Sequence, residues 1–219
     1  VQLCKLRDLQ ELGHTIVLVV GEATAMVGDP SGRNKLRPQL TREDVQANLV
    51  TYTEQAKLVL DLDRAEVRHN SDWFDRFGFE DTLKLLARST VARMLERDTF
   101  DTRMKAGEPI GVHELLYPLM QGWDSVEIAS DVELGGTDQL FNLLVGRQLQ
   151  EQTGNEPQVC LTQPLINGLD GRKMSKSYGN TIRMFWPQKQ LKKAVMGIDT
   201  DATPLEDPKD TDQPLFQLW

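Results

Sequence analysis

Cysteine and histidine are scarce in this chain, which has two cysteines and three histidines among 219 residues. So few residues cannot build a disulfide framework, and they offer no spacing typical of a zinc site. Long apolar runs are also lacking, because the longest, Ile16–Val20, is far shorter than the roughly 20 residues that span a bilayer. We therefore expect no resident metal and no membrane-spanning segment, and a protein of the reducing cytoplasm.

Positive charge is in deficit, with 25 Lys+Arg against 33 Asp+Glu and a net charge of −8. Affinity for nucleic-acid phosphates depends on clustered lysine and arginine, so the chain is not expected to bind DNA, and any contact with RNA must be local. Neither end resembles a natural terminus, since a helical pattern is already under way at Leu3 and Trp219 closes the start of another. We expect a stretch of a longer protein.

Helical and strand patterns alternate along the sequence. Leucines from Leu3 to Leu12 recur at helical spacing and predict a helix that stops at Gly13, and the β-branched run over 15–20 predicts a strand buried on both faces. Further strands are predicted at 66–69, 133–134 and 159–166, and further helices at 41–60, 81–105, 112–123, 138–152 and 188–196. This alternation predicts an α/β fold with a parallel sheet covered by helices on both faces.

A polar loop over 168–180 carries the most informative residues. The chain has neither a G-x-G-x-x-G nor a Walker A sequence, so a bound nucleotide would need another phosphate site. Lys173 and Lys176 lie three residues apart among glycines and serines, where both ammonium groups can reach one polyphosphate and offset charge on departing pyrophosphate. A solvated basic loop is the alternative for such a lysine pair.

The literal sequence of this loop carries a resemblance. Residues 173–177 read KMSKS and match the signature of class I aminoacyl-tRNA synthetases. Four further stretches resemble bacterial tyrosyl-tRNA synthetases: LQELGHTIVLVVGEATAMVGDPSG (9–32), NSDW (70–73), YPLMQGWD (117–124) and DVELGGTDQLFNLLVGRQLQ (131–150). The resemblance implies a Rossmann-like catalytic domain.

Two features depart from that pattern. The H-I-G-H signature of class I enzymes is not present, and ELGH at 11–14 imitates it at a position that is not catalytic in the family. After the signature loop, SYGNTIRMF (177–185), QLKKAVM (190–196) and EDPKD (206–210) resemble tryptophanyl-tRNA synthetases instead.

The candidate site can also be examined from the residues alone. Tyr117, Gln121 and Asp124 are spaced i, i+4, i+7, so they line one helix face if the helix survives Pro118, which is expected to kink or break it. Polar groups in an apolar stripe must be paired or face a cavity; pairing with neighbouring backbone is the alternative. Asp138 follows a strand end, where α/β sheets bind ligands; its carboxylate suits a ribose diol or, alternatively, a helix N-cap.

The resemblance implies individual roles. Asp124 would accept the hydrogen bond of a tyrosine phenol, and the substrate ammonium would be held by Tyr117, Gln121 and Asp29. Thr24 and Asn70 would line the same pocket, and Gln139 would lie on the tyrosine side of the reacting centre. The ATP site would comprise Gly136, Asp138, Lys173, Ser175, Lys176 and Ser177, with Lys173 and Lys176 catalytic and Mg²⁺ arriving with ATP.

The resemblance implies a tyrosine–tRNA ligase that joins tyrosine to ATP, releases pyrophosphate and transfers the tyrosyl group to tRNA(Tyr). A tryptophan–tRNA ligase and a non-catalytic RNA-binding paralogue are the alternatives. The implied domains are a catalytic domain at 1–178, with a connecting region at about 81–125 and the signature loop at 168–178, and the beginning of a helical tRNA-binding domain at 179–219. A homodimer is implied, with candidate interface residues Leu83, Leu86, Val91, Met94 and Leu95.

Overall fold

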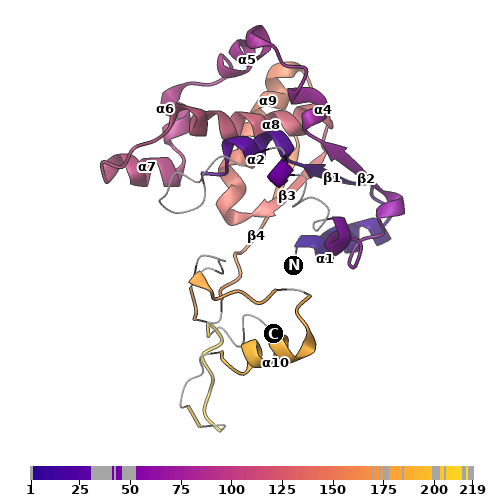
Figure 1. Ribbon diagram of the computed structural model, residues 1–219, viewed down its shortest axis with the longest axis vertical. Coiled ribbons are helices and arrows are strands. Elements are labelled where there is room, and N and C mark those ends of the chain that lie inside the picture. The colour runs from indigo at the N-terminus through magenta and orange to yellow at the C-terminus, as the bar shows by residue number, and fades with distance from the viewer. Residues whose placement is uncertain are drawn as a thin grey trace. The chain divides into compact units, whose positions relative to one another are not determined.

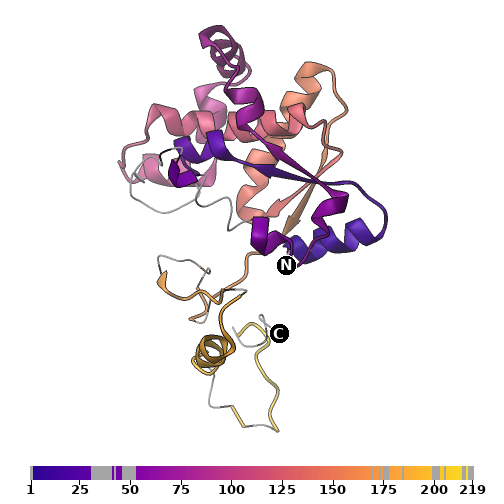
Figure 2. The same cartoon turned by 45° about the vertical axis from the view of Figure 1, so that its right-hand side comes forward.

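The computed structural model describes residues 2–30, 41, 43–45, 53–168, 170–172, 174, 178–183, 185–198, 203–204, 206–213 and 216. The chain divides into two compact units, 1–163 and 164–219. Of the helices and strands whose bounds are given below, only α10 (Gln188–Val195), the amber helix in Figure 1 and Figure 2, lies in the second unit. The predicted division into a catalytic domain ending at 178 and a helical domain after it stays a prediction.

The strands of the first unit are parallel. β1 (Ile16–Val20) pairs with β2 (Ala65–His69), with Ile16 opposite Ala65. β3 (Val132–Gly136) pairs with β4 (Val159–Gln163), with Val132 opposite Val159. Parallel neighbours need a long crossover, and α9 (Leu140–Thr153) supplies it between β3 and β4 (Figure 1). The α/β class with parallel strands is confirmed, although the described strands form separate pairs rather than one continuous ladder.

Three predicted helices are present at nearly their full length, as α1, α9 and α10. Gly13, with a φ of +93°, follows α1 as expected, and the region 81–105 is mostly helical as predicted, with three helices in it. None of the helices in the described ranges is both long and apolar enough to span a bilayer. The remaining bounds are α1 (Gln2–Glu11), α2 (Glu22–Val27), α4 (Ser71–Phe74), α5 (Phe79–Leu86), α6 (Val91–Leu95), α7 (Asp98–Lys105), α8 (Tyr117–Glu127) and the 3₁₀ turns η1 (Leu62–Arg64), η2 (Val112–Leu116) and η3 (Thr137–Gln139).

The start of the predicted helix at 41–60 is confirmed by its cap. The Thr41 amide donates to Asp44 Oδ2 at 3.1 Å, and the Asp44 amide donates to Thr41 Oγ1 at 3.2 Å. This reciprocal pair satisfies amides that the first helical turn leaves unbonded. Residues 46–52 lie outside the described residues, and beyond them the chain is helical over 53–56 and turns at 57–59.

Pro118 breaks the predicted helix at 112–123 into η2 and α8. Proline occupies the second position of α8, where its missing N–H removes no helical hydrogen bond. A regular helix therefore starts at Tyr117, and Tyr117, Gln121 and Asp124 share one of its faces.

α8 and α9 form the packed centre of the first unit and run side by side (Figure 1). A Cβ on Gly122 would come within 2.9 Å of the Gly146 backbone nitrogen, so glycine is needed where the helices cross. The core residues around this contact are Leu85, Met94, Leu119, Val145 and Leu149. Of this helix pair, α8 carries Tyr117, Gln121 and Asp124 of the candidate site.

β1 is less buried than its β-branched sequence predicts. Ile16 is buried, but residues 17–20 are half-buried. Among the described strands only β2 pairs with β1, and β2 is itself half-exposed, with Val67 at 36% exposure. Composition reports a preference for burial, whereas actual burial depends on the neighbours that the fold supplies.

Candidate active site

Asp124 in α8 is the centre of a buried cluster of polar side chains. Trp73 Nε1 donates to Asp124 Oδ1 at 3.0 Å, and Asn70 Nδ2 lies 3.4 Å from Asp124 Oδ2. Asn70 is fully buried; it also donates to Thr24 Oγ1 at 3.2 Å and accepts from the Ala23 amide at 2.8 Å. The helices α2, α4 and α8 meet here (Figure 1), so Thr24, Asn70 and Asp124 are brought together.

The Asp124 carboxyl is poised between its two protonation states. Burial raises the pKa of Asp124 to about 7; the hydrogen bonds from Trp73 and Asn70 oppose the rise, and the charges of Glu133 and Glu127 add to it. Each carboxylate oxygen has a second lone pair beyond the one already used. The side chain can therefore accept one more hydrogen bond, and a donor that does so stabilises the ionised form.

A second cluster surrounds Asp29, just beyond the end of α2. Gly28, with a φ of +86°, turns the chain there. Asp29 Oδ1 accepts from Arg97 Nη2 at 3.2 Å, and Asp29 Oδ2 accepts from Gln139 Nε2 at 3.3 Å. The Arg97 side chain is only 3% exposed against 30% for Asp29, so a buried cation faces a more accessible carboxylate.

Arg97 was not among the residues that the sequence identified. It precedes α7, three residues from Met94 and from Phe100, which are both buried. Its guanidinium carbon lies 5.5 Å from the centre of the Phe100 ring, and its Nη1 is buried without a partner in the described ranges. The sequence signal for Arg97 was its position between apolar residues at helical spacing. A charged side chain is buried at such a position only where it has a partner.

Asn142 joins the two predicted glutamines. It is fully buried, and its Nδ2 donates to Gln121 Oε1 at 2.8 Å and to Gln139 Oε1 at 2.9 Å. Because Gln139 in turn donates to Asp29, hydrogen bonds link α8, α9, η3 and the segment after α2. Asn142 was also missed by the sequence analysis.

Tyr117 lies close enough to both clusters for their charges to act on it. Burial raises the pKa of the Tyr117 phenol far above its usual range; the charges of Asp29 and Asp124 raise it further, and Arg97 opposes them. The phenol therefore stays protonated at neutral pH and is available as a hydrogen-bond donor.

Gly136 and Asp138 lie at the carboxyl end of β3, where parallel strands place ligand-binding groups. Gly136 is buried and Asp138 is half-buried. The capping alternative for Asp138 is wrong, because Gly136 occupies the N-cap of η3 and Gln139 that of α9, whereas Asp138 lies within η3. Whether Gly136 and Asp138 hold a ribose stays a prediction.

The signature residues Lys173, Ser175, Lys176 and Ser177 lie outside the described residues. Asp170, near the base of their loop, accepts from Asn180 Nδ2 at 2.7 Å and from Arg172 Nε at 2.8 Å. These bonds, that from Asn180 foremost, lower the pKa of Asp170 to about 2. The Met174 amide also donates to the Ile166 carbonyl at 3.1 Å, so both ends of the loop are tied within the second unit.

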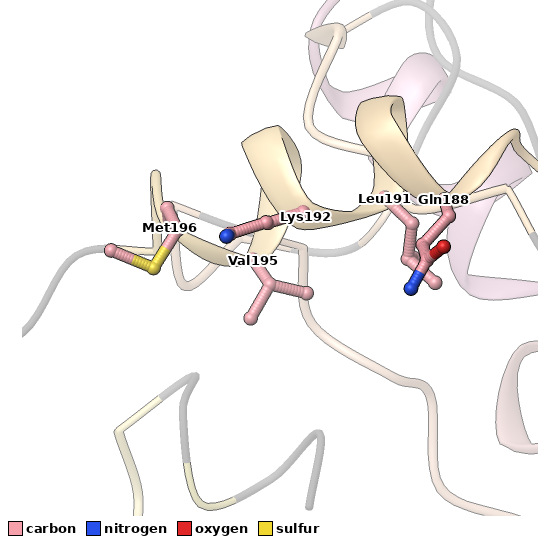
Figure 3. A pocket seen from close by; sticks show the side chains of 5 residues that line it. All are labelled: Gln188, Leu191, Lys192, Val195 and Met196. Atoms are coloured by element: carbon pink, nitrogen blue, oxygen red, sulfur yellow. The ribbon is translucent and has the colours of Figure 1, made fainter.

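A shallow groove of about 330 Å³ runs along α10 (Figure 3). Its lining residues are Gln188, Leu191, Lys192, Val195 and Met196. The groove is mainly apolar, and its lining contains none of the predicted site residues.

Comparison with known proteins decides the family. A profile described as "tRNA synthetases class I (W and Y)" matches residues 1–205. The chain belongs to this family of class I tRNA synthetases. It is 57% identical over 199 residues to the tyrosine–tRNA ligase of Thermotoga maritima, covering 90% of this chain and 50% of that protein. It is 54% identical over 202 residues to the tyrosine–tRNA ligase of Ralstonia nicotianae, covering 92% and 52%.

This class I synthetase chain spans about half the length of the curated relatives that it matches. The predicted resemblance to bacterial tyrosyl-tRNA synthetases is confirmed. The match to the Thermotoga protein extends over 199 of 219 residues and therefore passes through the signature loop into α10. The tryptophanyl-like stretches thus do not favour the tryptophan alternative.

Solved structures agree with the fold of the synthetase chain. The tyrosyl-tRNA synthetase of Archaeoglobus fulgidus, complexed with L-tyrosine, superposes with a TM-score of 0.73 at 27% identity, covering 97% of this chain and 62% of that one. The tryptophanyl-tRNA synthetase of Campylobacter jejuni gives a TM-score of 0.67 at 23% identity, covering 99% and 66%, and supports the fold alone.

Proposed function

We propose that the protein containing this chain is a tyrosine–tRNA ligase. It would activate tyrosine with ATP to form tyrosyl-adenylate and pyrophosphate, and then transfer the tyrosyl group to tRNA(Tyr). The observation that carries this proposal is Asp124, a buried carboxyl held by Trp73 and Asn70 with capacity for one more donor. A tyrosine phenol supplies that donor and an apolar side chain does not. The tyrosine ligases among the relatives support the same substrate.

The amino-acid end of the substrate would bind at the second cluster. A carboxylate pairs with an ammonium through charge-assisted hydrogen bonds, so Asp29 is the principal candidate for the tyrosine ammonium. Tyr117 and Gln121 come from the same face of α8 as Asp124 and would contact the same amino acid. With both ends of tyrosine held, its carboxylate is positioned for attack on the α-phosphate.

The nucleotide would be bound at the end of β3 and by the signature loop. Gly136 allows close approach of the backbone, and Asp138 would accept from the ribose hydroxyls. Lys173 and Lys176, assisted by Ser175 and Ser177, would stabilise negative charge on pyrophosphate as it leaves. Mg²⁺ would enter with ATP as part of the substrate.

Attack by a carboxylate needs no general base, since that group is already ionised at neutral pH. The protein's contribution is then orientation of the substrates and stabilisation of charge. Tyr117 fits this scheme, because its phenol stays protonated and does not act as a base, while its oxygen can still accept a hydrogen bond from the substrate ammonium.

We further propose a homodimer in the cytoplasm. Three of the predicted interface residues are exposed: Leu83 at 48%, Leu86 at 42% and Val91 at 61%. The prediction that Met94 belongs to the interface is wrong, because Met94 is 3% exposed and lies in the core of its own chain. The exposed three suit an isologous patch, in which the same surface meets its copy.

Amino-acid-dependent exchange of pyrophosphate into ATP tests the proposed function. The protein as its gene encodes it should catalyse exchange with tyrosine and at most trace exchange with tryptophan. Exchange that depends on tryptophan and not on tyrosine would contradict the substrate, and no exchange with either would contradict the activity.

A further inference from the structure

Asn142 occupies the position where two candidate substrate side chains meet. It lies in the first turn of α9 and is fully buried, with its amide nitrogen 2.8 Å from Gln121 Oε1 and 2.9 Å from Gln139 Oε1. We propose that Asn142 is a positioning residue that fixes the orientation of both glutamine amides toward the amino-acid substrate. This inference rests on the proposed function of the site.

The direction of the hydrogen bonds gives Asn142 this role. A primary amide has two N–H groups, and Asn142 directs them to the oxygens of Gln121 and Gln139. With its oxygen held, Gln139 turns its nitrogen toward Asp29, to which it donates at 3.3 Å. A glutamine amide without such a partner can exchange its oxygen and nitrogen by rotation, so Asn142 decides which atom each glutamine presents.

The carbonyl end of Asn142 indicates that the position serves the glutamines. Asn142 Oδ1 is buried without a hydrogen-bond partner in the part of the chain that the structure describes. An unpaired buried acceptor destabilises the folded protein, so a role in folding alone does not explain an asparagine at this position. The donor end, by contrast, is fully used on two residues of the candidate site.

Gln150, on the same helix, shows what a structural amide looks like. It is also fully buried, but its Nε2 donates to the backbone carbonyls of Ser125 at 3.2 Å and Ser130 at 2.9 Å. Its Oε1 accepts from the backbone N–H of Gln158 at 2.7 Å. Both ends of Gln150 are paired and neither reaches a candidate substrate residue, so Gln150 is a matched control.

The test compares Asn142→Ala, Asn142→Leu and Gln150→Leu in the protein as its gene encodes it. Leucine nearly preserves the size of asparagine and removes its N–H groups, so it separates hydrogen bonding from space filling. Both Asn142 variants should raise the KM for tyrosine about tenfold in pyrophosphate exchange, with the KM for ATP within about twofold of wild type. Gln150→Leu should lower the Tm and leave the KM for tyrosine unchanged.

A milder variant and a double variant complete the design. Asn142→Ser retains one donor and should raise the KM for tyrosine about threefold, which keeps the test valid if the larger changes prevent folding. In a Gln121→Ala background the effect of Asn142→Ala should shrink, because one of its two targets is gone. A purely structural asparagine would not show this coupling.

The inference is overturned if the Asn142 variants behave like Gln150→Leu, with a lower Tm and an unchanged KM for tyrosine. It is equally overturned if the Asn142→Ala effect is the same with and without Gln121. Failure of the proposed function is a separate outcome, seen as wild-type protein that exchanges pyrophosphate without dependence on tyrosine.

Discussion

The guanidinium of Arg97 and the carboxylate of Asp29 form an ion pair in which Nη2 lies 3.2 Å from Oδ1. The residues are 68 positions apart in the sequence, and the cation is the more deeply buried partner. Asp29 is thereby held by Arg97 on one oxygen and by Gln139 on the other. A carboxylate fixed in this way is a prearranged partner for an ammonium group.

Replacement of Arg97 by methionine should therefore impair tyrosine binding. Methionine fills similar volume without the charge, so Asp29 would lose one of its anchoring donors. We expect a KM for tyrosine raised about tenfold and a free energy of unfolding lowered by about 1–3 kcal/mol. Steady-state exchange and urea unfolding measure the two effects. Arg93→Met, which removes an exposed ion pair with Glu96, is the control and should change neither by much.

Tyrosine affinity should depend on pH through Asp124. A phenol donor favours the ionised carboxyl, whose pKa in the unliganded protein is about 7. Below that pKa the carboxyl must lose its proton, so affinity should rise from pH 5.5 to about 7 and then level off. Calorimetric titration with tyrosine checks the trend, and Asp124→Asn should flatten it. The same steepness in Asp124→Asn would assign the dependence to another group.

The pH dependence that Asp124 gives to protein stability should run in the opposite direction to that of tyrosine affinity. The folded-state pKa of Asp124 is above the ordinary value of 3.8, so the folded protein binds the additional proton between about pH 4 and 7. The contribution of Asp124 to the free energy of unfolding is therefore greatest below pH 4 and declines as pH rises to about 7. Urea unfolding at pH 5 and at pH 8 checks this. Between these two pH values the free energy of unfolding should fall by less in Asp124→Asn than in wild type.

Lys173 and Lys176 should act more on the transition state than on bound ATP. Replacement of either by alanine should lower kcat for adenylate formation at least tenfold, with the KM for ATP changed by less than about threefold. Lys189→Ala, at an exposed position of α10, is the control. A raised KM for ATP with unchanged kcat would show that the loop serves only ground-state binding.

Leu83→Lys with Val91→Lys should weaken the proposed dimer. Charges on an isologous patch meet their own copies, so two substitutions place four ammonium groups at the interface. Light scattering at micromolar concentration should give a dimer for wild type and a monomer for the double variant. Val159→Lys, at 59% exposure on β4, should remain dimeric. A monomeric wild type would refute the proposal.

Local pattern was enough to predict some parts of the site. The helical spacing of Tyr117, Gln121 and Asp124 depends only on α8, and the position of Pro118 determines where that helix begins. Asp138 was harder to assign. The 3₁₀ turn η3 precedes α9, so the two N-caps fall on neighbours of Asp138, and the sequence pattern does not distinguish these positions.

Arg97 and Asn142 depend on tertiary packing instead. Arg97 reaches the site only because the segment before α7 packs near the end of α2, and Asn142 only because α9 lies along α8. Neither contact has a periodic signature in the sequence. In the structure both residues have the same feature: each is a buried polar side chain that hydrogen-bonds to a predicted site residue.

Discrimination between tyrosine and phenylalanine is the most direct measurement of how this site works. Phenylalanine would leave the buried Asp124 without the donor that it can still accept, so the wild-type kcat/KM for adenylate formation should favour tyrosine by about 100-fold or more. Asp124→Ala should reduce that ratio, mainly through lost activity with tyrosine. A wild-type protein that activates both amino acids equally, or an Asp124→Ala variant with undiminished preference for tyrosine, would contradict the role of Asp124.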